Sequence, residues 1–167
     1  PNRNPVTCAL PHRGFQVTVS CDLENWFDTV REDQLVAAGV PPDIAKQITI
    51  DGVCRQGLPT SPVAANIAAV AFDKAILRGL AANMTKGYSY TRYADDLTVS
   101  VNDQFDVPFV LYVLRHAVSG MNWTIAEHKT HIQHAKAGRR IIVGIAVDDR
   151  LQATRKTRRS EERRVGK

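Results

Sequence analysis

Alternating apolar and polar residues predict the first strands of this chain. Residues 15–21 alternate in this way, are rich in valine and run directly into Asp22. Residues 88–100, YSYTRYADDLTVS, alternate on both sides of a tight Ala94-Asp95-Asp96 centre. This second pattern predicts two short strands joined by a turn.

The last third of the chain predicts two more strands. Residues 123–126 are expected to form one of them, followed by a polar turn over residues 127–130. Residues 141–147 are expected to form the other, with Gly144 marking a bulge or the close approach of another chain.

Apolar residues at helical spacing predict the segments between the strands. Helices are expected over residues 30–39, 41–50, 63–80 and 105–119. The alanine-rich third segment is apolar on nearly every side, which is typical of a helix buried against a sheet. Ser61 is its expected N-cap and Pro62 its first helical residue. Residues 1–14 contain three prolines and no apolar period, which predicts a loop.

The order of these elements predicts the fold class. A strand, helices, a hairpin, a helix and two strands favour an α+β fold, in which a ferredoxin-like antiparallel sheet carries helices on one face. In such a sheet the first strand and the hairpin lie side by side. Asp22 is then expected to face the hairpin tip at Asp95 and Asp96.

The composition indicates the broad class of protein but says little about its chemical function. The 167 residues suit about one domain, and 44% hydrophobic with 23% charged residues is typical of a globular protein without a membrane span or leader. The chain begins with Pro1 rather than methionine, which indicates a fragment. Cys8, Cys21 and Cys54 show no CxxC spacing, so neither a disulfide framework nor a zinc site is indicated, and a reducing, cytoplasmic setting is expected.

The net charge of +5 is a property of the C-terminal tail. Residues 155–167 hold seven basic and two acidic side chains, so residues 1–154 are neutral overall. Residues 159–167, RSEERRVGK, are similar to the in-frame translation of a common sequencing adapter and are expected to be a non-native scar. Net charge therefore supports no inference about nucleic acid.

The acidic residues have two interpretations. Asp95 and Asp96 can be turn residues that bond their own main chain, and Asp22 can cap the helix that follows it. Alternatively, the three carboxylates form an oxygen-rich site for a pair of Mg²⁺ ions, as in displacement at phosphorus. No lysine or arginine adjoins any of the three in sequence, so a divalent cation would keep them ionised.

Two other segments bear on this choice. Gln56 and Gly57 lie in a predicted loop, where glycine lets the backbone approach a ligand and the amide can bond a base or ribose. His128, His131 and His134 recur every third residue, but no cysteine or carboxylate cluster completes a metal site there.

Together these motifs resemble the palm of reverse transcriptases. They occur in that family's order: 22–28 (DLENWFD), 56–57 with 61–62, 93–96 (YADD), 129–130 and 143–144. The form YADDLTVS with a later VGIAV is most similar to bacterial retron and group II intron enzymes. Glu24 departs from the family, because related bacterial enzymes often carry lysine there.

The resemblance implies a role for each matching residue. Asp22, Asp95 and Asp96, with Leu23, would bind two Mg²⁺ ions, with Mn²⁺ as the alternative. Leu23, Phe27, Gln56 and Gly57 would line the incoming nucleotide, Phe27 as the steric gate against a 2′-hydroxyl. Lys129 would protonate or neutralise pyrophosphate as a further catalytic residue. Primer and template contacts are expected from Tyr93, Val143 and Gly144.

The resemblance also implies partners and an incomplete enzyme. An RNA template, a DNA or RNA primer, dNTPs and a cognate structured RNA are the expected partners, in a bacterial cytoplasm and without a membrane. Residues 1–154 would be the palm alone, without fingers or thumb, so little or no polymerase activity is expected. The alternatives are an RNA-dependent RNA polymerase, a repurposed RNA-binding or defence scaffold, and a generic ferredoxin-like binding domain.

Overall fold

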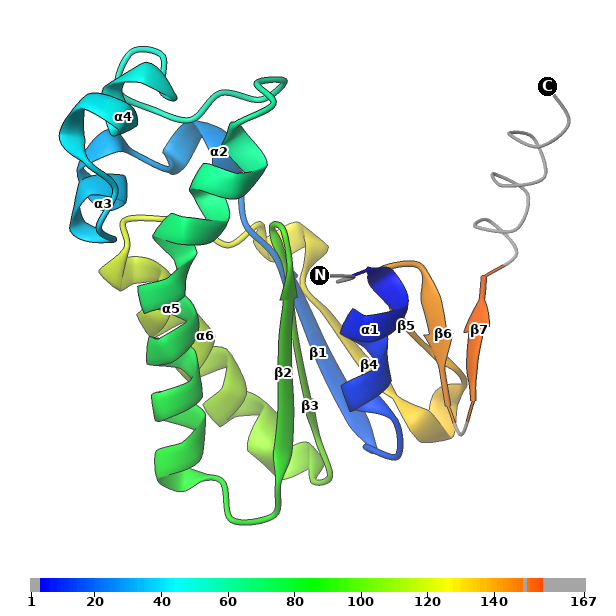
Figure 1. Cartoon of the computed structure of the whole chain (residues 1–167). Coiled ribbons are helices and arrows are strands. Elements are labelled where there is room, and N and C mark those ends of the chain that lie inside the picture. Colours follow the sequence, from blue (N-terminus) through cyan, green and yellow to red (C-terminus); the bar gives the residue numbers. More distant parts are fainter. Residues whose placement is uncertain (1–3, 149, 155–167) are drawn as a thin grey trace, which may run out of the picture.

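A four-stranded antiparallel sheet is the centre of the molecule (Figure 1). The computed structural model describes residues 4–148 and 150–154, so the predicted basic tail over residues 155–167 lies outside the described residues. The strands are β1 (Val17–Asp22), β2 (Tyr88–Tyr93), β3 (Asp96–Val101) and β4 (His131–His134). Their order is β2-β3-β1-β4, so β1 and the hairpin lie side by side as predicted.

Two long helices cover one face of this sheet (Figure 1). They are α5 (Ser61–Asn83) and α6 (Val107–Gly120). Alternate residues of β1, such as Val17 and Val19, are buried in the core with residues of both helices, because side chains alternate across a strand. The predicted α+β class, with an antiparallel sheet and helices on one face, is confirmed.

A close approach of α5 and α6 depends on Gly79. A Cβ atom at this position would lie 2.8 Å from Cγ1 of Val113, closer than carbon atoms normally come.

None of the described helices is long and apolar enough to cross a membrane.

Three short helices lie beyond the end of β1 (Figure 1). They are α2 (Trp26–Thr29), α3 (Glu32–Ala37) and α4 (Pro42–Gln47), and α2 and α3 contact α5. Helices were expected over residues 30–39 and 41–50, and both occur in shorter form. The expected N-cap of α5 is wrong: Thr60 occupies that position, and the Ser61 hydroxyl donates to the carbonyl of Arg55 at 2.7 Å.

The other face of the sheet is covered by α1 (Pro5–Ala9) and a second sheet (Figure 1). That three-stranded sheet has the order β5-β6-β7, with β5 (Arg140–Ile142), β6 (Ile145–Val147) and β7 (Leu151–Ala153). Residues 1–14 were predicted to be loop, which is wrong for α1. A capping box between Asn4 and Thr7 begins this helix.

The single strand expected over residues 141–147 is instead a hairpin. Val143 (φ 47°) and Gly144 (φ 75°) form a two-residue turn between β5 and β6, with Ile142 paired to Ile145. Positive φ is strained for a β-branched residue such as Val143.

The strand expected over residues 123–126 is also wrong. Only Ile125 forms a bridge there, to Leu23, and the strand at this edge is β4. Three short 3₁₀ helices complete the chain near the strands: η2 (Gln104–Asp106), η3 (Glu127–Lys129) and η4 (Ala135–Ala137), while η1 (Leu10–His12) follows α1.

A buried polar network joins the sheet to η1 and β5. The ring of His12 hydrogen-bonds the Ser100 hydroxyl at 2.8 Å and the Thr91 hydroxyl at 2.7 Å. Ser100 bonds Thr18 at 2.7 Å, and Thr18 accepts from Arg140 at 3.0 Å. Burial, and secondarily the Arg140 charge, lowers the pKa of His12 to about 4. His12 is therefore neutral at pH 7.

This network predicts a loss of stability in mild acid. Unfolded His12 takes up a proton below its ordinary pKa of 6.5, whereas folded His12 does so only near 4. The unfolded state then binds more protons, so the His12 contribution to the free energy of unfolding falls by about 3 kcal/mol as pH drops from 6.5 to 4.

Urea unfolding of wild type and His12→Gln across this pH range measures the contribution as the difference between the two profiles. His116→Gln, the same substitution at an exposed position, is the matched control. Parallel profiles for wild type and His12→Gln would contradict the assignment.

Candidate active site

Two of the three predicted carboxylates lie opposite each other at the end of the sheet. Asp22 closes β1 and pairs in register with Asp96, which opens β3. Asp95 lies in the turn before Asp96, and its carbonyl accepts from the Leu23 amide at 3.1 Å. The β2–β3 turn is therefore bonded to the end of β1, as the sequence predicted.

Asp22 does not cap a helix. The N-cap of α2 is Asn25, and Oδ2 of Asp22 accepts from Nζ of Lys129 at 2.7 Å. Oδ1 of Asp22 is buried and, among the described residues, has no hydrogen-bond partner. The capping interpretation is wrong for this residue.

Backbone pairing after α6 brings Lys129 to Asp22. The Ala126 amide donates to the Asp22 carbonyl at 2.8 Å, and the Glu24 amide donates to the Thr124 carbonyl at 2.9 Å. The segment once expected to be a strand thus places η3 beside the carboxylates. No cation adjoins them in sequence, but Lys129 adjoins Asp22 in space.

The carboxylates repel one another. Burial, followed by the charges of Asp22 and Asp95, raises the pKa of Asp96 to about 6, while the Lys129 charge acts in the opposite direction. Burial and the neighbouring Asp22 also raise the pKa of Asp95. A further cation would relieve this repulsion and hold the group ionised.

A groove of about 260 Å³ opens beside these residues. Asp22, Asp96, Lys129 and Val143 line it, whereas Asp95 and Gly144 do not. The rest of its wall consists of Ser20, Cys21, Thr98, His131, Gln133 and Ile141.

The groove offers oxygen donors that suit a divalent cation, but a complete set of metal ligands is not assembled among the described residues. Asp22 Oδ1 and Ser20 Oγ are buried oxygens on one face of β1 without partners among the described residues. Oxygen donors of this kind are those that Mg²⁺ prefers. Within the part of the chain that the structure describes, no group of three or more His, Cys, Asp or Glu is placed to hold a metal ion.

Arg92, which sequence reasoning missed, supports the turn. Its Nη1 donates to the carbonyl of Ala94 at 3.0 Å, and Ala94 has a φ of 54°. Its Nε and Nη2 each contact a carboxylate oxygen of Asp73 at 2.9 Å, and its guanidinium lies 5.2 Å from the ring centre of Trp26. The Arg92 side chain is only 8% exposed.

The sequence carried a signal for this contact. Arg92 follows Tyr88 and Tyr90 on the face of β2 that packs against α5, where an unpaired charge would be costly. Asp73 and Asn66, both bonded to Arg92, are seven residues apart on α5 and so share one face of that helix. A charged residue in a strand position that faces the core predicts such a partner.

The residues expected to line the nucleotide lie just before α2, within α2, and in the loop before α5. The Leu23 side chain is buried in the core, so its backbone is the part left to face a ligand. Phe27 is half-buried, with its ring centre 5.5 Å from that of Trp26. Gln56 and Gly57 are exposed in the loop before α5, and neither lines the groove. Their nucleotide contacts stay predictions.

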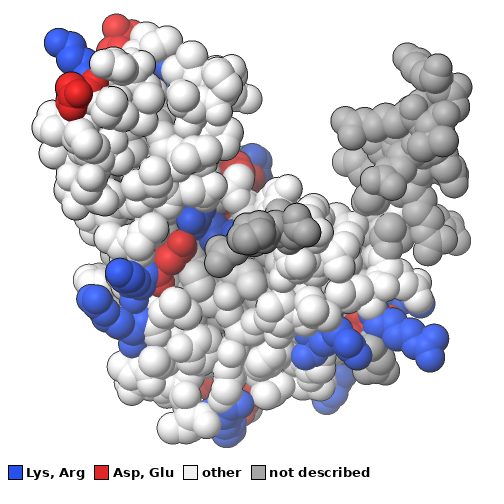
Figure 2. Space-filling view, viewed as in Figure 1, with Lys and Arg blue, Asp and Glu red and all other residues white. Residues whose placement is uncertain are grey.

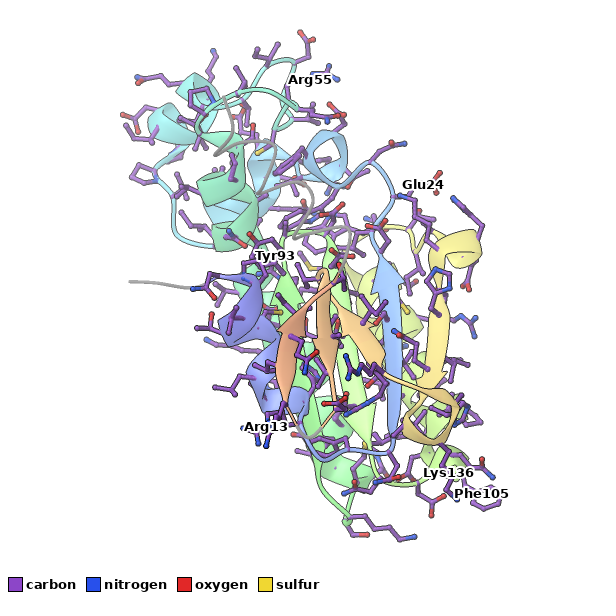
Figure 3. All side chains as sticks on the ribbon, turned by 90° about the vertical axis from the view of Figure 1, so that its right-hand side faces the viewer. Arg13, Glu24, Arg55, Tyr93, Phe105 and Lys136 are labelled. Carbon is purple, nitrogen blue, oxygen red and sulfur yellow. The ribbon has the colours of Figure 1, made fainter. Side chains whose placement is uncertain are left out.

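Figure 3 shows how the outer residues surround this end of the sheet. Tyr93 and Glu24 lie near it, and Arg55 lies beyond them in the loop that carries Gln56. Tyr93 is 38% exposed and pairs with Asp96 across the hairpin. Its contact with a primer stays a prediction.

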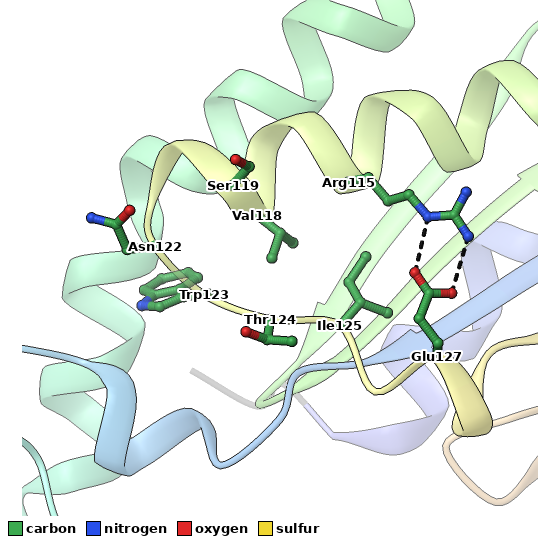
Figure 4. A pocket seen from close by; sticks show the side chains of 8 residues that line it. All are labelled: Arg115, Val118, Ser119, Asn122, Trp123, Thr124, Ile125 and Glu127. Carbon is green, nitrogen blue, oxygen red and sulfur yellow. Dashed lines mark hydrogen bonds and ion pairs between the residues drawn. The ribbon is translucent and has the colours of Figure 1, made fainter.

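A pocket larger than this groove lies elsewhere. A pocket of about 460 Å³ forms between the end of α6 and residues 122–127 (Figure 4), and it contains an ion pair in which Arg115 donates to both oxygens of Glu127. None of the predicted site residues lines it.

Charged side chains are scattered in small groups over the face in Figure 2, without one basic surface there.

Comparison with known proteins agrees with this arrangement. Residues 3–159 match the family described as reverse transcriptase (RNA-dependent DNA polymerase). The chain is 30% identical to the retron Mx65 reverse transcriptase of Myxococcus xanthus over 95% of its length and 42% of that protein. It is 27% identical to the retron Ec48 reverse transcriptase of Escherichia coli, over 87% and 38% of the two chains. The chain thus spans less than half the length of these relatives.

Solved structures share the fold at low identity. An apo telomerase from Candida tropicalis superposes with a TM-score of 0.67 at 10% identity, over 83% of this chain and 33% of that one. A telomerase from Candida albicans in complex with a fragment of telomeric RNA gives 0.65 at 10% identity, over 84% and 31%. At this identity the likeness establishes the fold alone.

The Arg92–Asp73 contact predicts a large cost when one partner is neutralised. Asp73→Asn leaves the buried guanidinium without its carboxylate, so the free energy of unfolding should fall by about 2–4 kcal/mol. Urea unfolding at pH 7 measures this loss. Glu127→Gln makes the same chemical change in the exposed pair with Arg115, and should cost less than about 1 kcal/mol. Equal losses in the two variants would contradict the structural role of Arg92.

Proposed function

Because the chain belongs to the reverse transcriptase (RNA-dependent DNA polymerase) family, we propose that it is the catalytic palm of an RNA-directed DNA polymerase. The reaction would transfer a nucleotide from a dNTP to a primer 3′-hydroxyl on an RNA template. One observation carries the proposal: Asp22 and Asp96 pair at the end of two adjacent strands, with Asp95 in the intervening turn and Lys129 on Asp22.

Divalent metal is part of this proposal. Asp22, Asp95 and Asp96, with the backbone at Leu23, would hold two Mg²⁺ ions, or Mn²⁺ in their place. The ions would supply the positive charge that activates a 3′-hydroxyl and stabilises a leaving pyrophosphate. Three observations support this assignment: the raised pKa values of Asp95 and Asp96, the buried Oδ1 of Asp22 that has no hydrogen-bond partner within the described part of the chain, and the all-oxygen donor set.

The chain's own groups would orient the substrates. Lys129 would donate a proton to pyrophosphate, and its ammonium beside Asp22 supports this role. Phe27 would exclude a 2′-hydroxyl by its bulk, and Gln56 with Gly57 would contact the nucleotide from the loop before α5. Tyr93 and the Val143–Gly144 turn would contact the primer.

The partners follow from the reaction. An RNA template, a DNA or RNA primer and dNTPs would be bound, together with a cognate structured RNA, in a bacterial cytoplasm. Relatives named as retron reverse transcriptases favour a retron over a group II intron, a choice that the motifs left open. The domain boundary proposed for the palm, residues 1–154, leaves fingers and thumb to the rest of a longer protein.

Two alternatives make different predictions. An RNA-dependent RNA polymerase would prefer ribonucleotides, so the relative use of ribo- and deoxynucleotides by the full-length protein separates it from a reverse transcriptase. A repurposed RNA-binding or defence scaffold would need neither catalysis nor three interacting carboxylates. The mutual repulsion of Asp22, Asp95 and Asp96 favours a catalytic site over a scaffold.

Asp95→Asn in the full-length protein should abolish primer extension, by at least about a thousandfold, because a metal-binding charge is lost. Template binding, measured separately by fluorescence anisotropy, should stay within about twofold. Asp43→Asn, at an exposed position of α4, is the matched control and should retain extension. Retained activity in Asp95→Asn would overturn the metal assignment.

The 167 residues alone should extend a primer little or not at all, because the basic residues that hold a triphosphate and the thumb that clamps a duplex would lie outside them. A gel-based extension assay with a primed RNA template and Mg²⁺ tests this expectation, with the full-length protein as positive control. Measurable extension by the short chain would refute it.

A further inference from the structure

The β5–β6 hairpin is held against the main sheet by an unusual side-chain contact. The carboxamide of Gln133, on β4, bonds both backbone groups of Ile141, on β5. Its Oε1 accepts from the Ile141 amide at 2.7 Å, and its Nε2 donates to the Ile141 carbonyl at 3.0 Å. A side chain thus provides the pair of bonds that a neighbouring strand would normally make.

A second contact fixes the residue before it. Arg140 is 2% exposed, and its Nη1 donates at 3.0 Å to Thr18, on β1 four residues before Asp22. Thr18 in turn bonds Ser100 on β3. A buried cation is tolerated only where its surroundings hold it, so Arg140 ties β5 to β1, which ends at Asp22, and to β3, which begins at Asp96.

The turn of the hairpin is strained. Val143 has a φ of 47°, a conformation that costs a β-branched residue about 1–3 kcal/mol and persists only where neighbouring contacts impose it. Val143 also lines the groove that contains Asp22 and Asp96. Gln133 contacts Ile141, two residues before Val143, and Arg140 lies three residues before it.

We infer that Gln133 and Arg140 are positioning residues, which dock the β5–β6 hairpin on the main sheet and set the distance of the Val143–Gly144 turn from the carboxylates. Arg140 does not line the groove, and Gln133, which does line it, has its carboxamide bonded to the backbone of Ile141. The consequence for the primer rests on the proposed polymerase function, whereas the docking itself does not.

The docking is tested in the 167-residue chain by amide hydrogen exchange followed by NMR. Gln133→Met keeps the length of the side chain and removes both bonds to Ile141. The Ile141 amide should then exchange at least about tenfold faster, while the Val99 amide in β3 keeps its rate. Gln104→Met makes the same change at an exposed residue and should alter neither. Unchanged exchange at Ile141 would overturn the docking.

Arg140→Lys is the second variant. This variant keeps the positive charge but replaces the planar guanidinium with an ammonium group, so faster hydrogen exchange of the β5 amides is again expected. Because Gln133 lies partly at the surface, Gln133→Met keeps the test valid even where Arg140→Lys fails to fold.

The effect on the primer is tested in the full-length protein by steady-state extension. Gln133→Met should raise the KM for primer–template about tenfold and leave the KM for dNTP and kcat at saturating primer unchanged. Faster exchange at Ile141 with an unchanged primer KM would overturn the positioning role and leave the polymerase assignment intact. No extension by the wild-type full-length protein would refute the proposed function and, with it, the primer role, while the docking result would stand by itself.

Discussion

The register between β1 and β3 is the constraint on which the site depends. Asp22 lies opposite Asp96 only because Val17 pairs with Val101 at the other end of the same ladder. A shift of one residue would turn the valines of β1 from the helices to the groove, and would turn Asp22 from the groove to the core. The burial of apolar side chains under α5 and α6 therefore fixes the acidic pair at the groove, although it contributes nothing to the chemistry.

Carboxylates that repel one another need support from outside the site. Arg92 provides it on one side, by joining the backbone of the β2–β3 turn to α5 and to Trp26. The hydroxyl network of His12, Ser100 and Thr18 provides it on the other side, where α1 and the second sheet cover the polar face. The stability gained in these buried contacts offsets the electrostatic cost of the site, as is common where charge is concentrated for function.

The spacing of apolar residues along the sequence predicted those strands and helices whose formation depends mainly on neighbouring residues. Period-two alternation identified β1 and the β2–β3 hairpin, and helical spacing identified α5 and α6. The short elements were not predicted. Helix α1 has only five residues and depends on a capping box and a proline. The β5–β6 turn has valine at a position where glycine or asparagine is typical. The contact between Lys129 and Asp22 could not come from spacing alone, because the bridge between Leu23 and Ile125 that creates it joins distant parts of the chain.

The position of β1 in the sheet has a consequence for how the protein is made. Both neighbours of this central strand, β3 and β4, come much later in the sequence, and the ion pair of Asp22 with Lys129 spans 107 positions. While the chain emerges from the ribosome, β1 remains unpaired during the synthesis of the four helices α2 to α5 and of β2, the first strand of the hairpin. Asp22, the first of the three aspartates to be synthesised, is thus among the last to reach its place, and a protein truncated before residue 129 would contain all three carboxylates without the cation beside Asp22.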